Sequence, residues 1–452
     1  MSESSKNSDL ILNGSVPKAA LFLAVPAMGN FFLETFFHLV DIYWIAKLGE
    51  KAIASIAAWA FVSWCLISIT QIAEVGINSL VAKSWGTKDF EKGRKIASSG
   101  YHFSLWVSVS SAIIFYLLSI PLMDFMNLEP EVVTLALDYL NVMLFGVPLL
   151  GMLFSIDATF RGSGDTVTPI KILSVVILLN CILDPLLIFG YYGFPRLELF
   201  GAALATVFSN FVGVIWGFYL LRKRGFYWKL KVLPKKETLF KIAKIGSPIA
   251  LNGLLFSYVY IHLTRLITEY GTTQVAALTL GHRIEGFLWP ICLGFLVTAT
   301  TMVGQNLGAG KFERVRQSVN YTAFFSAVIC LVISLLFIFK GTWIASFFTD
   351  DIILAEASGT YLEIIGYFEL FLGLELTFEG AFAGLGKTVP TIAISTPINL
   401  GRIPLAIYFA SLYGIEGIWW TIGITTMLKG AILGLWLIPN YLSDKELLKL
   451  KH

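Results

Sequence analysis

Apolar residues occur in long blocks along this 452-residue chain, and short polar segments separate the blocks. A helix needs roughly 20 apolar residues to cross a bilayer core about 30 Å thick. The blocks are too long for barrel strands, and a helix satisfies its backbone hydrogen bonds internally in lipid. The pattern predicts twelve transmembrane helices, at residues 18–46, 53–80, 95–118, 132–158, 168–190, 201–221, 240–268, 274–300, 317–339, 354–381, 388–411 and 415–438.

The second half of the chain repeats the first at a distance of 222 residues. Identical residues recur at this distance: Pro26 and Pro248, Gly49 and Gly271, Arg94 and Arg316, Tyr139 and Tyr361, Gly151 and Gly373, and Gly162 and Gly384. Such self-similarity indicates a duplicated architecture. Six crossings per half give both halves the same orientation, so the repeat is parallel.

The predicted fold is therefore an all-α membrane protein with two pseudo-symmetric six-helix bundles. We expect an N-terminal lobe at 1–221 and a C-terminal lobe at 248–452. A basic cytoplasmic linker, which includes the start of the seventh helix, is expected at 222–247.

Basic residues gather in alternate loops, which predicts the orientation of the helices. One basic loop contains Lys88 and Arg94, and another begins with Arg222. The loop between 95–118 and 132–158 instead contains Asp124 and no Lys or Arg. Both termini are therefore expected in the cytoplasm.

Composition excludes several classes of function. Only 14% of residues are charged and 56% are hydrophobic, so no length remains for a soluble catalytic module. The net charge of +3 gives no support for nucleic-acid binding. The five histidines form no metal-spaced cluster, and no Gly-x-Ser-x-Gly or nucleotide-binding loop is present. We therefore expect neither enzymatic activity nor a cofactor.

Positions at which the two halves carry different residues are candidates for functional residues. Asp41 falls on Leu263, and a small local shift places Asp184 opposite Ile403, so both acids belong only to the N-terminal half. A charge near the bilayer centre costs about 2.5–3.5 kcal/mol on insertion scales. Such residues usually face a cavity or a partner.

The spacing of the polar residues places them on common helix faces. Glu34, His38 and Asp41 are four and three residues apart, and Asn180 and Asp184 are four apart. Two carboxylates that face one small cavity can take up a proton near neutral pH. The same carboxylates with the Asn180 amide oxygen also suit a hard cation such as Na⁺. A buried hydrogen-bond network that only fixes packing is the structural alternative.

Other intramembrane residues have both structural and functional interpretations. Glu74 is a candidate for lining a cavity, as are Glu34 and His38. Asp157 is expected near the cytoplasmic surface or, if deeper, within the acidic cluster. Pro26 can bend the first helix and couple the bend to protonation of Asp41, or it can simply set the helix shape.

The C-terminal half has its own charges, for which pairing within the structure is the favoured interpretation. A second ion or substrate site is the alternative, and the roles of these charged residues stay open. The residues concerned are Arg283, Glu285, Glu363, Glu369, Glu375, Glu379, Arg402 and Lys429.

Several motifs together resemble a known family over nearly the whole chain. They are Pro26 to Asp41 followed by Trp44-Ile45-Ala46-Lys47-Leu48-Gly49, then Arg161-Gly162-Ser163-Gly164-Asp165-Thr166 with Pro169, then Asn180 with Asp184-Pro185, and Gly201 to Thr206. The chain resembles the multidrug and toxic compound extrusion (MATE) transporters, and within them the DinF-like branch.

The resemblance implies two lobes around a central cleft, alternating access, and export of organic cations or other amphipathic compounds in exchange for H⁺ or Na⁺. It implies a coupling site of Asp41, Asn180, Asp184 and Thr206, with Tyr139 in the same network; these four residues would bind the metal if the ion is Na⁺. Asp157 replaces a usual asparagine and is included as a coupling candidate. A monomer in a prokaryotic inner membrane is expected, with the lipid bilayer and small molecules as its partners.

Two other functions remain open. A flippase for lipid-linked precursors on the same superfamily scaffold would need a strongly basic cavity, whereas most Lys and Arg lie in the expected cytoplasmic loops. A membrane-embedded enzyme would need a catalytic cluster. The natural substrate and the coupled ion are not indicated by the residues.

Overall fold

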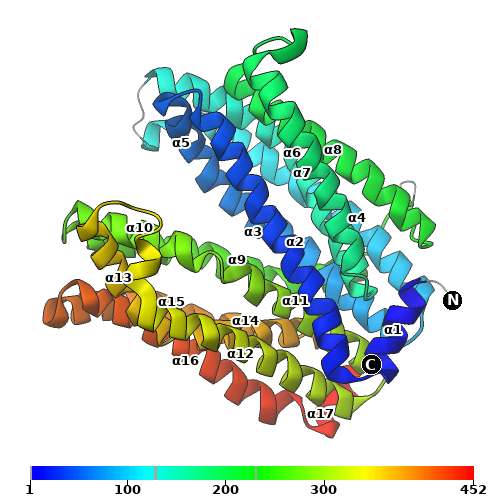
Figure 1. Ribbon diagram of the computed structural model, residues 1–452. Helices are drawn as coiled ribbons and strands as arrows, with labels where there is room; N and C mark the ends of the chain where they lie inside the picture. The colour runs from blue at the N-terminus through cyan, green and yellow to red at the C-terminus, as the bar shows by residue number, and fades with distance from the viewer. Residues whose placement is uncertain (1–2, 127–129, 230–231, 452) are drawn as a thin grey trace. The chain divides into compact units, whose positions relative to one another are not determined.

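The computed structural model describes residues 3–126, 130–229 and 232–451, and nearly all of them are helical (Figure 1). The helices of the first half are α1 (Glu3–Asn13), α2 (Val16–Ala46), α3 (Glu50–Gly86), α4 (Phe90–Leu117), α5 (Ser119–Met126), α6 (Pro130–Gly162), α7 (Val167–Phe189), η1 (Tyr191–Gly193) and α8 (Glu198–Lys223). Those of the second half are α9 (Lys236–Thr268), α10 (Thr272–Glu285), α11 (Trp289–Gly308), α12 (Phe312–Ala345), α13 (Ile352–Gly366), α14 (Glu369–Gly384), α15 (Val389–Tyr413), α16 (Ile415–Tyr441) and α17 (Asp444–Lys451).

Within the described residues, 11 helices are long and apolar enough to cross a membrane. The predicted crossing at 354–381 is absent from these 11 because two shorter helices, α13 and α14, share that segment. The short helices α1, α5 and α17 were not expected from the apolar blocks.

The predicted continuous helix at 274–300 is wrong, because the chain breaks between α10 and α11. At this break Phe287 N–H donates to the Ile284 carbonyl at 3.2 Å, and Leu288 N–H donates to the Glu285 carbonyl at 2.8 Å. Pro290 has no N–H, so it cannot donate the helical hydrogen bond to the carbonyl four residues earlier. The turn therefore tightens to three-residue spacing, a feature that often marks a hinge.

The predicted continuous helix at 354–381 is also wrong, and here no proline is involved. Phe368 N–H donates to the Ile365 carbonyl at 2.8 Å, again with three-residue spacing. The Tyr367 ring stacks on Trp420 of α16 with 5.9 Å between ring centroids. The Phe368 ring also meets Trp420, edge to face at 5.8 Å. Packing against a distant helix thus accompanies this break.

The structure divides into two compact units. Unit 1 contains residues 29–85 and 89–250, with the N-terminal residues up to Asn7. Unit 2 contains residues 8–28, 86–88 and 251–452. Helix α2 therefore has Pro26 in unit 2 and Asp41 in unit 1.

Each unit has its own apolar core. In unit 1, α6 packs on α4 and α8, and α7 packs on α8; Tyr101, Ile156 and Phe160 lie in the core between them. In unit 2, α11 packs on α14 and α12 packs on α13, and Tyr361 and Trp419 lie in the core. The helices so arranged hold the polar groups described below at fixed positions.

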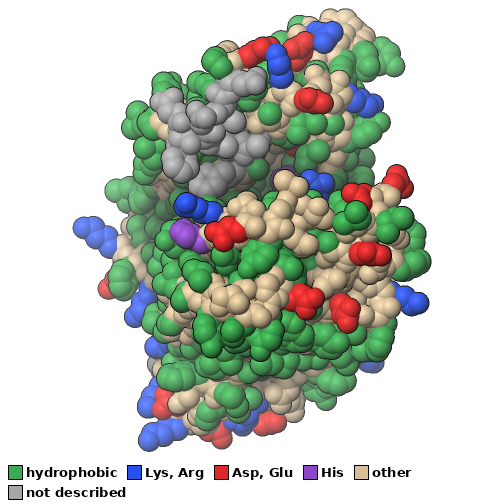
Figure 2. All heavy atoms as spheres, turned by 90° about the vertical axis from the view of Figure 1, so that its left-hand side faces the viewer, with side chains coloured by type: hydrophobic (Ala, Val, Ile, Leu, Met, Phe, Trp, Pro, Cys, Tyr) green, Lys and Arg blue, Asp and Glu red, His purple; other side chains and the backbone are tan. Residues whose placement is uncertain are grey.

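Large apolar side chains also cover the outside of the helices. Leu117 of α4 is 69% exposed, and Leu331 and Val332 of α12 are exposed as well. Figure 2 shows hydrophobic side chains over much of the visible face, with charged side chains scattered among them. Soluble proteins rarely expose so much contiguous apolar surface, which suits helices surrounded by lipid.

Candidate cation site

Four polar side chains from three helices meet in unit 1. Asn180 Nδ2 donates to Asp184 Oδ1 at 3.1 Å and to Thr206 Oγ1 at 3.3 Å. Thr206 Oγ1 donates to Asp41 Oδ2 at 3.5 Å. The carboxyl groups of Asp41 and Asp184 also interact directly. The structure thus brings together the four residues that the resemblance implies.

Local sequence explains how these side chains come together. Asn180 and Asp184 are one turn apart on α7, so they share a face. Gly201 allows α8 to approach α7 closely, because a Cβ atom there would crowd the Leu187 carbonyl. Within α7, Pro185 has no N–H and so leaves one carbonyl without its helical partner beside Asp184.

The cluster is buried and rich in oxygen. Asn180 and Asp184 are fully buried, and Thr206 is 4% exposed. Asp41 Oδ1, Asn180 Oδ1 and Asp184 Oδ2 have no hydrogen-bond partner among the described residues. Two carboxylates cannot both stay charged in contact without a positive charge between them. A proton shared by the pair, or a small hard cation held by these oxygens, removes the conflict.

Tyr139 and His38 lie beside this cluster. Tyr139 is 4% exposed and interacts electrostatically with both Asp41 and Asp184. His38 is exposed and interacts with Asp41 one turn further along α2. Within the described part of the chain, no group of three or more His, Cys, Asp and Glu side chains is arranged to hold a metal ion.

Glu74 and Asp157 belong to a second polar cluster in unit 1, centred on Arg161. Arg161 is 3% exposed, and its Nη2 lies 3.3 Å from Glu74 Oε1. Its guanidinium also forms an ion pair with Asp157, one turn earlier on α6. Asp157 therefore belongs to the Arg161 cluster. Within the described residues, no contact joins Asp157 to the Asp41 cluster. Glu34 interacts electrostatically with Arg161 and Glu74.

The sequence analysis did not identify Arg161 as the partner of these acids. Asp157 and Arg161 are four residues apart on one helix, a spacing that indicates an ion pair. That spacing could have predicted the ion pair between Asp157 and Arg161. The contact with Glu74 was not predictable, because it joins α3 to α6 across 87 residues of sequence.

The charges of unit 2 form different arrangements. Lys429 Nζ lies 2.7 Å from Glu375 Oε1, and both side chains are buried, which matches the favoured interpretation of paired charges. Arg402, also a predicted partner, instead donates from Nε to Thr425 Oγ1 at 2.7 Å. Asn252 Nδ2 donates to Glu379 Oε1 at 3.2 Å.

A buried tyrosine contacts an acid in unit 2 as well. The Tyr361 hydroxyl donates to Glu285 Oε2 at 2.9 Å and lies 3.2 Å from His282 Nε2. Glu369 is 1% exposed, and its Oε1 has no hydrogen-bond partner among the described residues.

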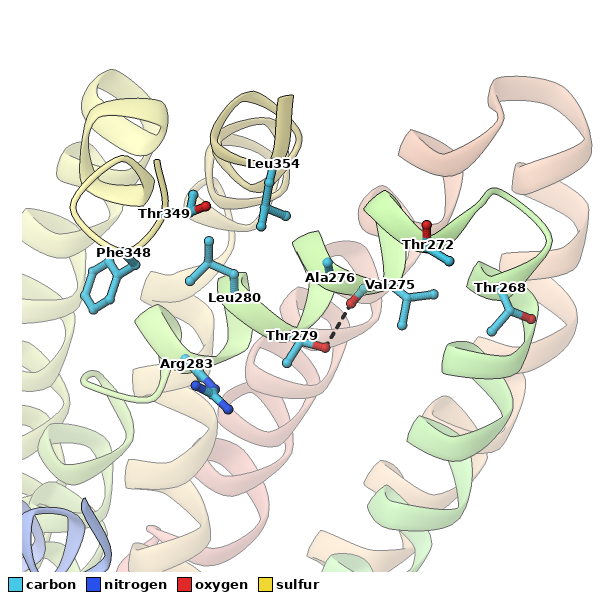
Figure 3. Close-up of a pocket in the computed structure, with 10 residues that line it drawn as sticks. All are labelled: Thr268, Thr272, Val275, Ala276, Thr279, Leu280, Arg283, Phe348, Thr349 and Leu354. Carbon is cyan, nitrogen blue, oxygen red and sulfur yellow. Dashed lines mark hydrogen bonds between the residues drawn. The ribbon is translucent and has the colours of Figure 1, made fainter. Parts of the chain in front are cut away.

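Unit 2 also has an open pocket of about 620 Å³ beside α10 (Figure 3). Its apolar wall includes Val275, Leu280, Phe348 and Leu354, and Arg283 lies at one end. Thr279 Oγ1 donates to the Val275 carbonyl at 2.9 Å and so cannot also donate to a ligand. The pocket is therefore mainly an apolar surface with one cation.

A family model settles the broader identity. The MatE model matches residues 26–186 and again residues 248–408, which are 222 positions further along the chain. The chain belongs to the MatE family. The two matches also confirm the internal repeat that was predicted from the sequence. As a member of a transporter family, this MatE protein is a multi-pass membrane transporter and not an enzyme.

Curated relatives cover nearly the whole of this MatE protein. The chain is 29% identical to a probable multidrug resistance protein NorM of Thermotoga maritima, over 89% of this chain and 88% of the relative. It is 25% identical to a FAD transporter of Shewanella oneidensis over 93% and 94% of the two chains. It is 24% identical to the multidrug export protein MepA of Staphylococcus aureus over 95% and 94%.

Solved structures show the fold. A crystal structure of MATE in complex with MaD3S has a TM-score of 0.88 and 24% identity, with 99% of each chain covered. A MOP superfamily transporter from Pyrococcus furiosus, described as having a binding pocket of reverse polarity, has a TM-score of 0.85, 23% identity and 99% coverage of each chain. The all-α fold with twelve membrane crossings in two bundles is therefore confirmed.

Proposed function

We propose that this MatE protein is a secondary antiporter that exports amphipathic or cationic organic compounds in exchange for H⁺ or Na⁺. The proposal rests above all on the contact between Asp41 and Asp184. The pair and the neighbouring Asn180 each have one oxygen atom without a hydrogen-bond partner among the described residues, and all three residues lie on apolar helices long enough to cross a membrane. Such a pair has a different charge when its ion is bound and when the ion has left, which is the requirement for coupling.

The coupled ion supplies the driving force. Moving one elementary charge through 100 mV releases about 2.3 kcal/mol. Ion binding to Asp41 and Asp184 stabilises one orientation of the transporter, and substrate binding stabilises the other. Pro26 lies on the same helix as Asp41 and provides a point at which α2 can bend.

The substrate class remains part of the proposal. The names of the relatives include two multidrug proteins and a FAD transporter, so the relatives are named for different substrates. We favour organic cations, because the buried acids of unit 1 attract positive charge. The expected setting is a prokaryotic inner membrane, with a monomer whose two termini face the cytoplasm.

The test is transport by the purified protein in liposomes, with inward proton and sodium gradients imposed separately. A fluorescent organic cation and a flavin nucleotide serve as alternative substrates. Asp41→Asn should abolish transport of the organic cation, because the pair can no longer change its charge in the same way. Asp138→Asn alters an exposed acid of α6 in the same unit and is the matched control.

Transport by Asp41→Asn at the rate of the parent protein would refute the proposed coupling site. Transport of the flavin nucleotide alone would refute the proposed substrate class. The gradient that drives transport identifies the ion.

A further inference from the structure

The open pocket beside α10 is lined by residues of unit 2 and has the size of a small-molecule site. Its volume of about 620 Å³ falls within the range of about 300–1,000 Å³ that is usual for ligand pockets. The described residues that line it come from the end of α9, from α10, and from the chain that leads from α12 into α13. In Figure 3, Leu280, Phe348 and Leu354 lie together, about one helical turn from Arg283. The pocket therefore offers an apolar wall beside a charged group.

Arg283 is a cation without a partner in the part of the chain that the structure describes. Its side chain is exposed, and it forms no hydrogen bond or ion pair with the described residues. The nearby acid Glu285 instead accepts a hydrogen bond from the Tyr361 hydroxyl at 2.9 Å. Arg283 lies eleven residues after the start of α10, about 16 Å along the helix axis and inside the predicted crossing. A charge at such a depth usually faces a cavity and pairs with an opposite charge, and an anion in the pocket supplies that partner.

The lining of the pocket contains no acid that would compete for Arg283. None of the described residues that line the pocket is Asp or Glu. The acids that follow Thr349 in the sequence, Asp350 and Asp351, are exposed, and Asp351 accepts a hydrogen bond from the Ile353 N–H at the start of α13. Thr349 Oγ1 accepts from the Asp351 N–H at 3.2 Å, which leaves the Thr349 O–H free to donate to a ligand. The polar groups of the pocket thus favour a negatively charged ligand.

The duplication shows that this cation is not part of the common helix scaffold. At a distance of 222 residues, Arg283 falls on Phe61 and Thr272 falls on Glu50. The corresponding positions of the first half therefore include an acid and no cation. Since neither the repeat nor an internal ion pair accounts for Arg283, binding of an external group is the function that its position supports.

We propose that the pocket beside α10 binds an amphipathic organic acid, with the carboxylate on Arg283 and the apolar body against Leu280, Phe348 and Leu354. The planar guanidinium of arginine presents two parallel N–H donors that match the two oxygens of a carboxylate. The apolar wall forms one group beside a single cation, which suits a molecule with one apolar body better than a phospholipid with two acyl chains. The site is separate from the Asp41–Asp184 pair and does not depend on the proposed antiport.

The experiment measures binding of a charged probe and of its neutral counterpart. The full chain is placed in nanodiscs of phosphatidylcholine and titrated with dansyl-labelled undecanoate or with the methyl ester of the same compound. Specific binding is the part of the dansyl signal that excess unlabelled dodecanoate, or its methyl ester, displaces. The variants are Arg283→Gln, which removes the cation, and Ala276→Trp, which fills the pocket. The matched control is Arg265→Gln, which changes an exposed arginine of α9 that does not line the pocket.

We expect the parent protein to bind the carboxylate at least about tenfold more tightly than the ester, because a hydrogen bond between charged groups is stronger than one between neutral groups. Arg283→Gln should weaken carboxylate binding by about the same factor and leave ester binding unchanged, which also shows that the pocket is intact. Ala276→Trp should weaken binding of both probes, and Arg265→Gln should bind both as the parent does.

Equal affinity of the parent for the two probes would overturn the preference for an anion. Unchanged carboxylate binding in Arg283→Gln, or an equal loss of both probes in that variant, would show that its charge does not hold the ligand. Normal binding in Ala276→Trp would place the probe outside this pocket. Replacing part of the phosphatidylcholine by phosphatidylglycerol tests the other occupant: loss of both probes would identify an anionic lipid as the ligand and overturn the organic acid.

Discussion

The two halves of this transporter keep the same packing contacts but place their charges differently. A Cβ atom on Gly151 would clash with Ser108, and one on Gly373 would clash with Cys330. Both residues of the second contact lie 222 positions after those of the first. Two helices approach closely at the same place in each half, so glycine is retained where a side chain would push them apart.

A second pair of contacts repeats in the same way. Gly162 lies against Val81 in unit 1, and Gly384 lies against Val303 in unit 2. The helix scaffold is therefore symmetric in detail. Close packing explains this, because both partners of such a contact must change together.

The charged residues show the opposite behaviour. Tyr139 and Tyr361 are equivalent and both are buried beside acids, but the acids come from different helices. Asp41 and Asp184 of unit 1 have no basic partner in direct contact among the described residues, whereas Glu375 of unit 2 pairs with Lys429. Under the antiport proposed above, unit 1 takes up the ion, whereas the Glu375–Lys429 pair of unit 2 holds two helices together.

The largest expected effect comes from removing an acid of unit 1. Asp184→Asn should reduce proton-driven or sodium-driven export to the level of protein-free liposomes, because the contact with Asp41 no longer binds an ion. Glu369→Gln alters a buried acid of unit 2 and should keep export near that of the parent. Export rates in liposomes test both. Equal losses in the two variants would break the contrast between the units.

An intermediate effect is expected from the buried ion pair of unit 2. Glu375→Gln leaves Lys429 buried without its partner and should lower the free energy of unfolding by about 3–5 kcal/mol. The double variant Glu375→Leu with Lys429→Met should recover most of that loss, since paired removal leaves no uncompensated charge. Unfolding in mixed detergent, followed by tryptophan fluorescence, measures both. A double variant as unstable as the single one would argue that the pair has a role beyond packing.

The smallest effect tests the symmetry of the scaffold. Gly151→Ala and Gly373→Ala should each lower the free energy of unfolding by about 1–3 kcal/mol, because an added methyl group overpacks the contact. The two losses should be similar, and Gly401→Ala, where a Cβ would meet nothing, is the control. A large loss at one glycine and none at the other would show that the repeated contacts differ in energy.

Much of the site was predictable because residues four positions apart on a helix share a face. Asn180 and Asp184 share a face of α7 by their four-residue spacing, and the repeat singled out Asp41 and Asp184 as acids of one half. Asp157 was predicted as a coupling candidate, and the structure pairs it with Arg161 of the same helix, a partner that the sequence analysis did not consider. Thr206 and Tyr139 came only from the family resemblance.

The sequence by itself determined the membrane crossings and the duplication, because both depend on the order of residues along the chain. Apolar blocks longer than a bilayer crossing have little choice but to form helices in lipid. Only the tertiary structure decided where α10 and α13 end and which acids face Arg161. Those outcomes depend on contacts such as Tyr367 with Trp420 and Glu74 with Arg161, which join residues far apart in sequence. The energy of such a contact exists only once the helices have packed, so no local pattern of residues encodes it.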